Sequence, residues 1–150
     1  MPIRRDLRPL YRTPEYFAAR DRVLARSRGR CEHCLRPKGE LVEMISGKTA
    51  DGNLFLLWRT PGRKHWTNQN GWPATKKDLQ VLADVETWRR YRSRTQLQMA
   101  HTDNNPRNHA SLAYLCAWCH LALDQSVHKA SRVNRKDRDR GILQMVEGVA

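Results

Sequence analysis

Two Cys-x-x-Cys pairs constrain the fold of this chain most, because they require two distant segments to meet. The pairs are CEHC (Cys31, Cys34) and CAWC (Cys116, Cys119), and the 81 residues 35–115 lie between them. Each pair can present two thiolates from one tight turn, and two such turns make a tetrahedral S4 site that suits zinc. The spacing is longer than in a zinc ribbon, so the intervening segment must loop out and return. We therefore expect one structural zinc ion, bound by all four cysteines.

Disulfides and a redox-active pair are the two alternatives for these cysteines. A redox site needs one pair rather than two. The first 15 residues, MPIRRDLRPLYRTPE, lack the apolar stretch of a secretory signal, so we expect the chain in a reducing cytoplasm, where disulfides are rare. With 150 residues, of which 39% are hydrophobic, the chain can close only a modest core. A structural metal contributes on the order of 10 kcal/mol to the folding of small modules and would stabilise such a core.

The net charge of +13 gathers in three segments. Residues 1–30 carry nine Arg against three acids, residues 85–94 four Arg against one, and residues 131–140 five basic residues against two, whereas residues 95–130 are neutral. A neutral centre between basic arms favours a site that acts on a polyanion, and Arg fits phosphate well, so nucleic acid is the expected partner. Solvated basic helices without a partner and a membrane surface are the alternatives. No run of about 18 apolar residues occurs, so no segment is expected to span a membrane. No strong apolar moment accompanies the charge, so a membrane partner is not expected either.

Capping and turn signals divide the first two thirds of the chain. Thr13-Pro14-Glu15 is typical of a helix start and predicts a lead-in helix over residues 13–30. Residues 35–96 form an insertion, in which LFLLW (54–58) between turn signals predicts a short hairpin or meander. Thr75 predicts a capped helix over roughly residues 76–92. Three tryptophans are predicted to form a satellite core, with a base-stacking platform as the alternative: Trp58, Trp66 and Trp72.

A strand, a polar loop and a helix are predicted around the second cysteine pair. Residues 97–100 are apolar and fit a strand that ends at His101, residues 112–115 return as a second strand or turn, and a helix follows from about Cys119 to Val127. His120 and Asp124 then share one helix face, a plausible two-ligand platform for a divalent ion, and His128 continues that face. An ordinary solvated helix face is the alternative. We expect His101 to face this helix across the loop, which favours chemistry.

The order of these motifs resembles the HNH endonucleases, also called ββα-metal or His-Me finger nucleases. AHTDNNPRN followed by LCAWCHLALD is similar to the zinc-containing members of phages and their bacterial hosts. The resemblance covers roughly residues 13–36 and 95–142 and leaves the insertion outside. It implies an α+β fold over residues 1–150 as a single HNH nuclease domain: a ββα-metal core (97–130) held by the four-cysteine zinc site, with an N-terminal helix, an inserted subdomain (35–96) and a basic tail (131–150).

The resemblance also implies a role for each polar residue of the motif. His101 matches the general base that activates water against the scissile phosphate, a role that suits a neutral imidazole. His120 and Asp124 match ligands of a catalytic magnesium or manganese ion, distinct from the zinc. Two positions depart from the family pattern, because Ala100 replaces a metal-binding Asp or His and Ser111 replaces an Asn. We therefore expect Asp103 to supply the missing oxygen, directly or through water, and Ser111 or Asn108 to hydrogen-bond the loop that positions the base.

Together these patterns predict a metal-dependent DNA endonuclease that nicks or cuts both strands. Double-stranded DNA is the expected substrate, a phage or prophage origin and a bacterial cytoplasm are implied by the resemblance, and phage packaging proteins are a further candidate partner. Two alternatives come from other classes. One is a catalytically impaired, zinc-dependent DNA-binding protein of the same fold, and the other is an RNA-binding zinc module.

Overall fold

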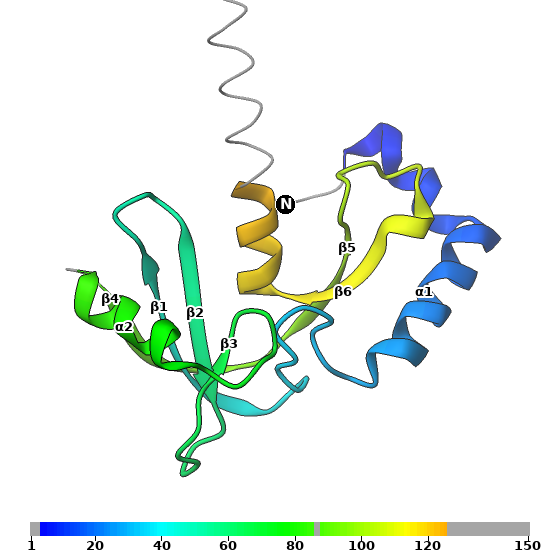
Figure 1. The fold of residues 1–150 in the computed structure, drawn as a ribbon. Coiled ribbons are helices and arrows are strands. Elements are labelled where there is room, and N and C mark those ends of the chain that lie inside the picture. Colours follow the sequence, from blue (N-terminus) through cyan, green and yellow to red (C-terminus); the bar gives the residue numbers. More distant parts are fainter. Residues whose placement is uncertain (1–3, 86–87, 126–150) are drawn as a thin grey trace, which may run out of the picture.

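The chain forms an α+β fold in which a four-stranded sheet and a two-stranded hairpin meet at the cysteine pairs (Figure 1). The computed structural model describes residues 4–85 and 88–125. The larger sheet has the strand order β3-β2-β1-β4, and the smaller sheet pairs β5 with β6. The elements are η1 (Arg5–Arg12), α1 (Pro14–Ser27), β1 (Leu41–Lys48), β2 (Leu54–Arg59), β3 (Thr67–Asn68), α2 (Lys76–Asp84), β4 (Trp88–Arg94), β5 (Leu97–His101), η2 (His109–Ser111) and β6 (Leu112–Cys116).

Helix α1 starts and ends near the residues that the sequence predicts. The Thr13 side chain accepts a hydrogen bond from the backbone N–H of Tyr16, 3.1 Å away, which caps the helix before Pro14. Arg28 takes the left-handed conformation (φ 51°) and ends the helix. The buried face of α1 packs against β6 through a cluster of five residues: Tyr16, Ala19, Val23, Leu112 and Tyr114. The predicted lead-in helix is therefore confirmed.

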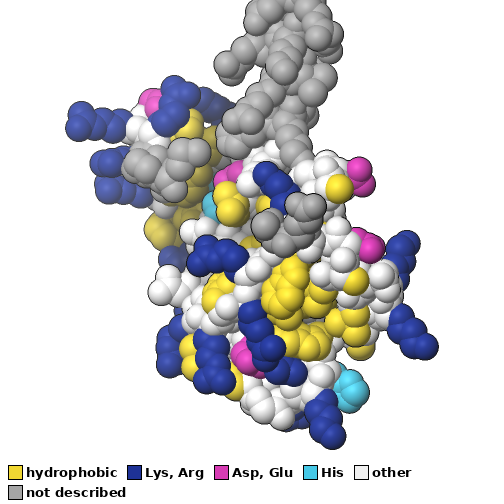
Figure 2. All heavy atoms as spheres, turned by 90° about the vertical axis from the view of Figure 1, so that its left-hand side faces the viewer, with side chains coloured by type: hydrophobic (Ala, Val, Ile, Leu, Met, Phe, Trp, Pro, Cys, Tyr) yellow, Lys and Arg dark blue, Asp and Glu magenta, His cyan; other side chains and the backbone are white. Residues whose placement is uncertain are grey.

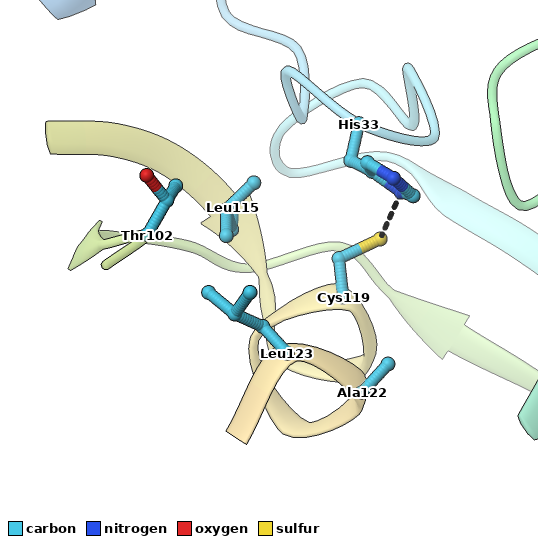
Figure 3. A pocket seen from close by; sticks show the side chains of 6 residues that line it. All are labelled: His33, Thr102, Leu115, Cys119, Ala122 and Leu123. Carbon is cyan, nitrogen blue, oxygen red and sulfur yellow. Dashed lines mark hydrogen bonds between the residues drawn. The ribbon is translucent and has the colours of Figure 1, made fainter. Parts of the chain in front are cut away.

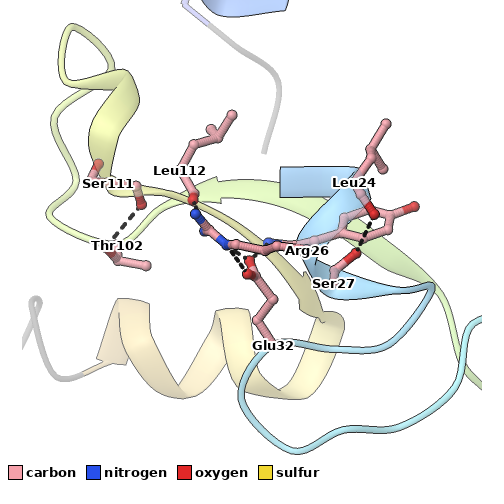
Figure 4. A network of polar contacts seen from close by, with 8 residues as sticks. Leu24, Arg26, Ser27, Glu32, Thr102, Ser111 and Leu112 are labelled. Atoms are coloured by element: carbon pink, nitrogen blue, oxygen red, sulfur yellow. Dashed lines mark hydrogen bonds and ion pairs between the residues drawn. The ribbon is translucent and has the colours of Figure 1, made fainter. Parts of the chain in front are cut away.

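A polar network joins the end of α1 to the first cysteine loop and to β6 (Figure 4). The Arg26 guanidinium pairs with the Glu32 carboxylate and donates to the backbone carbonyl of Leu112 at 2.8 Å. Glu32 accepts from the backbone N–H of Tyr114 at 2.8 Å, and its own N–H donates to the Tyr114 carbonyl at 2.9 Å. The loop that carries Cys31 and Cys34 is thus bonded to the strand that ends at Cys116.

The insertion forms the four-stranded sheet, and its central hairpin confirms the prediction for LFLLW. Strands β1 and β2 pair antiparallel, with Met44 opposite Trp58 and Ile45 opposite Leu57. Because side chains alternate along a strand, the two faces of the sheet serve different cores. One face packs on the cysteines through Val42, Met44, Leu56 and Trp58. The other packs under α2 through Ile45, Phe55 and Leu57.

The predicted helix over residues 76–92 is too long. Helix α2 spans Lys76–Asp84 and begins with a capping box between Thr75 and Asp78, but Trp88–Arg94 forms β4 instead. Strand β4 pairs antiparallel with β1, so its backbone groups find partners more than 40 residues away in the sequence. This long-range pairing overrides the local helical spacing of the apolar residues.

The tryptophans differ in their surroundings, and the satellite-core prediction fits one of them. Trp58 is buried in the main core beside the cysteines, and its Nε1 donates to the Cys34 carbonyl at 2.8 Å. Trp66 packs in the cluster under α2, as predicted. Trp72 is 69% exposed and belongs to no core.

The hairpin and the helix predicted around the second cysteine pair are both present. Strand β5 pairs antiparallel with β6, with His101 opposite Leu112, and residues 117–125 are helical. The predicted basic tail (131–150) and His128 lie outside the described residues. None of the helices in the described part of the chain has the length and apolarity needed to span a bilayer.

Candidate functional site

The four cysteines form one buried cluster. Their sulfur atoms all lie within 4.8 Å of one another, and none of the side chains is bridged by a disulfide. The Sγ atoms of Cys34 and Cys116 are 3.7 Å apart, close to the edge of about 3.8 Å that a tetrahedron with zinc–sulfur bonds of about 2.3 Å has. Backbone N–H groups of Cys116 and Cys119 point at sulfurs of the cluster, at 3.4 Å each. The cluster can therefore hold a metal ion such as zinc.

The electrostatics of the cluster also favour a cation. Hydrogen bonding with Cys116 lowers the pKa of Cys31 and raises the pKa values of Cys34 and Cys119, while hydrogen bonding with Cys119 lowers the pKa of Cys116 to about 6. Without a cation, the four cysteines thus cannot all be ionised, because their sulfurs lie within a few ångströms of one another and like charges repel. A divalent ion would let all four ionise, because its positive charge would offset the repulsion between neighbouring thiolates.

Arg36 is a buried charge beside this cluster that the sequence did not point to. Its side chain is almost completely buried, at 3% exposure, and one guanidinium nitrogen contacts Met44 Sδ. Burial alone would lower the pKa of Arg36, but the negative sulfurs of Cys116 and Cys34 outweigh it and raise the pKa. A divalent ion with four thiolates would carry a net charge of −2, and Arg36 would offset half of it. The Nε of Arg36 has no hydrogen-bond partner among the described residues. The buried cation is therefore stabilised by the negative sulfurs.

A small apolar pocket of about 270 Å³ lies against the cluster (Figure 3). His33 from the first cysteine loop borders it, and its Nδ1 is 3.7 Å from Cys119 Sγ. The remaining walls come from β6, the start of the loop after β5, and the helix of residues 117–125: Leu115, Thr102, Cys119, Ala122 and Leu123. His33 is therefore a hydrogen-bonding neighbour of one sulfur, not a fifth member of the cluster.

His101 stands at the end of β5 in a cluster of aromatic rings. Its Nε2 is 3.4 Å from Nδ1 of His109, and its ring meets that of Tyr11 edge-on at 5.8 Å between centroids. Tyr16 contacts His109 in the same way at 5.5 Å. Burial, and secondly the neighbouring His109, lower the pKa of His101, with Asp103 acting weakly in the opposite direction. The imidazole is therefore neutral at pH 7, as a general base requires.

Asp103 organises the loop between β5 and β6. Its Oδ1 accepts from Ser111 Oγ at 2.7 Å and from the backbone N–H of Asn105 at 2.9 Å, and its Oδ2 accepts from Asn108 Nδ2 at 2.7 Å. These bonds, that of Ser111 first, lower the pKa of Asp103 to about 2. Ser111 and Asn108 also bond the loop backbone. Both residues thus hold the loop that follows His101, which is the role the sequence suggested for one of them.

His120 and Asp124 form the expected pair on the helix. Their Nε2 and Oδ2 atoms are 3.7 Å apart, with each side chain less than a third exposed. Gln98 on β5 contacts Nδ1 of His120 at 2.5 Å. If the amide is turned so that its oxygen accepts from Nδ1–H, Nε2 is left unprotonated and ready to bind a metal. Gln98 is thus a supporting residue that strand alternation would have placed on the same face as Ala100.

The structure does not gather all the predicted site residues at one point. Within residues 4–85 and 88–125, the four cysteines are the one group of three or more Cys, His, Asp or Glu ligand atoms within 4.8 Å. No hydrogen bond or ion pair in this part of the chain joins His101 or Asp103 to the His120–Asp124 pair. The roles of these residues in catalysis therefore stay predictions.

Replacing any one of the four cysteines with Ser should abolish metal binding and unfold most of the chain. The lost metal–thiolate energy is comparable to the whole stability of a small domain. Metal content by elemental analysis, beside a circular dichroism melt, checks this expectation. A natively folded protein that holds no metal would contradict it.

Arg36→Met should weaken metal retention, because it leaves the buried negative cluster without its counter-charge. Removing one partner of a buried charge pair costs about 3–5 kcal/mol. We expect the metal to be lost at a lower chelator concentration, with Arg36→Lys between Met and wild type because the lysine keeps the charge but not the planar fork. Chelator resistance of Arg36→Met equal to that of the wild type would show that the guanidinium is not needed.

Comparisons with known proteins add no family to this description. No family model, curated protein or solved structure matches the chain. The site is thus defined by its own geometry: a buried four-sulfur cluster, a strand-end imidazole above an ordered polar loop, and a histidine–carboxylate pair on the helix that follows Cys116.

Proposed function

We propose that this protein is a metal-dependent DNA endonuclease of the HNH type, with the four cysteines holding a structural zinc ion. One observation carries the proposal most. The β5–β6 hairpin runs through Cys116 into the helix of residues 117–125, so that a strand-end histidine and a helical histidine–carboxylate pair occupy one ββα unit. The basic N-terminal segment supports DNA as the substrate, because it can bind phosphates beside this unit.

Each part of the unit has a chemical task in this proposal. Neutral His101 accepts a proton from a water molecule at its free ring nitrogen, and the Asp103-centred loop keeps the following backbone in place. His120 and Asp124 are the residues that would hold a magnesium or manganese ion, which keeps several waters and needs only one or two protein ligands besides substrate phosphate. When bound, such an ion would supply positive charge that offsets the charge developing on the phosphate.

A second candidate function is DNA binding without cleavage by the same fold. It is favoured by Ala100, which is buried and offers no ligand atom at the strand position that faces the helix. It is also favoured by Asp103, whose two oxygens both accept hydrogen bonds within the loop. We rank it second because a binding module has no need of the His101 and His120 side chains at these positions.

His101→Ala should slow plasmid nicking about 10²- to 10⁴-fold while leaving the fold and the metal content intact, because a general base contributes a factor of this size. His120→Ala should also lose cleavage, and excess Mn²⁺ should restore part of it. Supercoiled plasmid with Mg²⁺ or Mn²⁺ is the substrate, and His65→Ala is the matched control, since this histidine is exposed on the loop before β3. Unchanged nicking by His101→Ala would refute the assignment, and a wild type that binds but never cuts would favour the second function.

The acidic limb of the pH–rate profile should lie below pH 6.5, the ordinary value for histidine. Burial and His109 lower the pKa of His101, so the active neutral form persists to lower pH and is lost only as the pH falls through that lowered pKa. In His109→Gln the limb should move to higher pH, because one charge that opposes protonation of His101 is gone. A limb at or above pH 6.5 in the wild type would contradict this.

A further inference from the structure

Strand β4 presents a row of basic side chains along the edge of the four-stranded sheet. It pairs with β1 on one side only, and its sequence WRRYRSR contains four Arg and no Lys. Because side chains alternate, Trp88, Arg90, Arg92 and Arg94 share one face, while Arg89 and Tyr91 share the other. Tyr91 packs on the cysteine core. The row with three arginines therefore faces away from that core.

The one acid within the four strands is already paired with basic residues. The only acid within the four strands is Glu43, against six basic residues: Lys48, Arg59, Arg89, Arg90, Arg92 and Arg94. Glu43 accepts from Arg59 at 2.6 Å and from Arg90 at 3.1 Å, and these two bonds, that of Arg59 first, lower its pKa. Seen from the side of α2 and the sheet, basic side chains surround an apolar area (Figure 2).

The arginines of the row differ in their partners. Arg94 donates to the backbone carbonyl of Gly39 at 2.6 Å, and the Arg90 guanidinium lies 5.9 Å from the centre of the Trp66 ring. Arg90 is half exposed despite its bond to Glu43, and the Arg92 side chain is exposed, with no hydrogen bond or ion pair to any residue that the structure describes. Trp88, in the same row, is 42% exposed. Exposed arginines beside an exposed indole form a surface suited to phosphate and sugar rather than to an apolar partner.

The row leads directly to the candidate catalytic strand. Two residues, 95 and 96, separate β4 from β5, and His101 ends β5. His101 is nine positions after Arg92 in the sequence, so the two lie at most roughly 30 Å apart. One turn of a DNA duplex is about 34–36 Å long. The distance between His101 and Arg92 is thus no longer than one helical turn of a duplex.

We propose that the face of β4 formed by Trp88, Arg90, Arg92 and Arg94 binds the phosphate backbone of double-stranded DNA within a turn of the cleavage point. The choice of double-stranded DNA as the ligand rests on the proposed function. Charged residues on an edge strand also prevent pairing with another sheet, but native proteins most often use Lys for that purpose, and every charged residue of this row is Arg. The arginine row extends the bound duplex beyond the ββα unit and gives the insertion a role in holding the substrate.

The test compares two charge changes on opposite faces of the same strand. Arg90→Gln with Arg92→Gln removes two cations of the row, and Glu43 keeps Arg59 as its partner. Arg89→Gln is the control, because it lies on the same strand but on the other face. Binding of a 30-base-pair duplex is measured by fluorescence anisotropy from 50 to 200 mM salt, with melting curves and size-exclusion chromatography for each variant.

The double variant should bind the duplex at least about tenfold more weakly, and its salt slope should fall by about 1.8, or 0.9 for each lost phosphate contact. Arg89→Gln should keep the wild-type slope. Any of three results would overturn the proposal: an equal loss of DNA affinity in both variants, an unchanged salt slope in the double variant, or self-association without loss of DNA binding. A wild type that binds the duplex with this slope pattern but does not cut it would refute the endonuclease function and leave the arginine row standing.

Discussion

Four sulfur atoms within 4.8 Å of one another are the contact on which the rest of the molecule depends. They draw together the loop after α1, the end of β6 and the first turn of the helix of residues 117–125. The faces of both sheets then pack around them, and Arg36 fills the remaining side as a buried cation. The apolar content of the chain is modest, and a metal ion bound by these cysteines would replace part of the missing core.

The hairpin beside this centre has two faces with different chemistry. Gln98 and Ala100 face the helix and the cysteines, whereas Met99 packs toward α1 and His101 contacts Tyr11 of η1. The expectation that His101 faces the helix is therefore wrong. Side chains alternate along β5, so the His101 ring lies on the opposite face of the strand from Gln98 and Ala100. The imidazole and the His120–Asp124 pair therefore lie on opposite faces of the hairpin.

Local signals predicted the parts of the fold that depend on neighbouring residues. The Thr13 cap, the β1–β2 hairpin, the strand ending at His101 and the helix after Cys116 all follow from patterns a few residues long. The end of α2 was mispredicted because β4 is set by pairing with β1, which no local pattern encodes. The roles of Arg36 and His109 were not predicted for the same reason. The role of a single charge or ring beside a motif depends on neighbours that are distant in the sequence.

The two ends of the insertion lie side by side and are joined by backbone hydrogen bonds. The backbone N–H of Gly39 donates to the carbonyl of Thr95 at 2.8 Å, and the N–H of Thr95 donates to the carbonyl of Glu40 at 2.9 Å. A segment closed by such a clasp can change length between related sequences without moving the cysteines, because each doubling of a loop costs only about 0.6 kcal/mol in closure entropy. The sheet is thus a separable unit, whose length can change while the four cysteines keep their places.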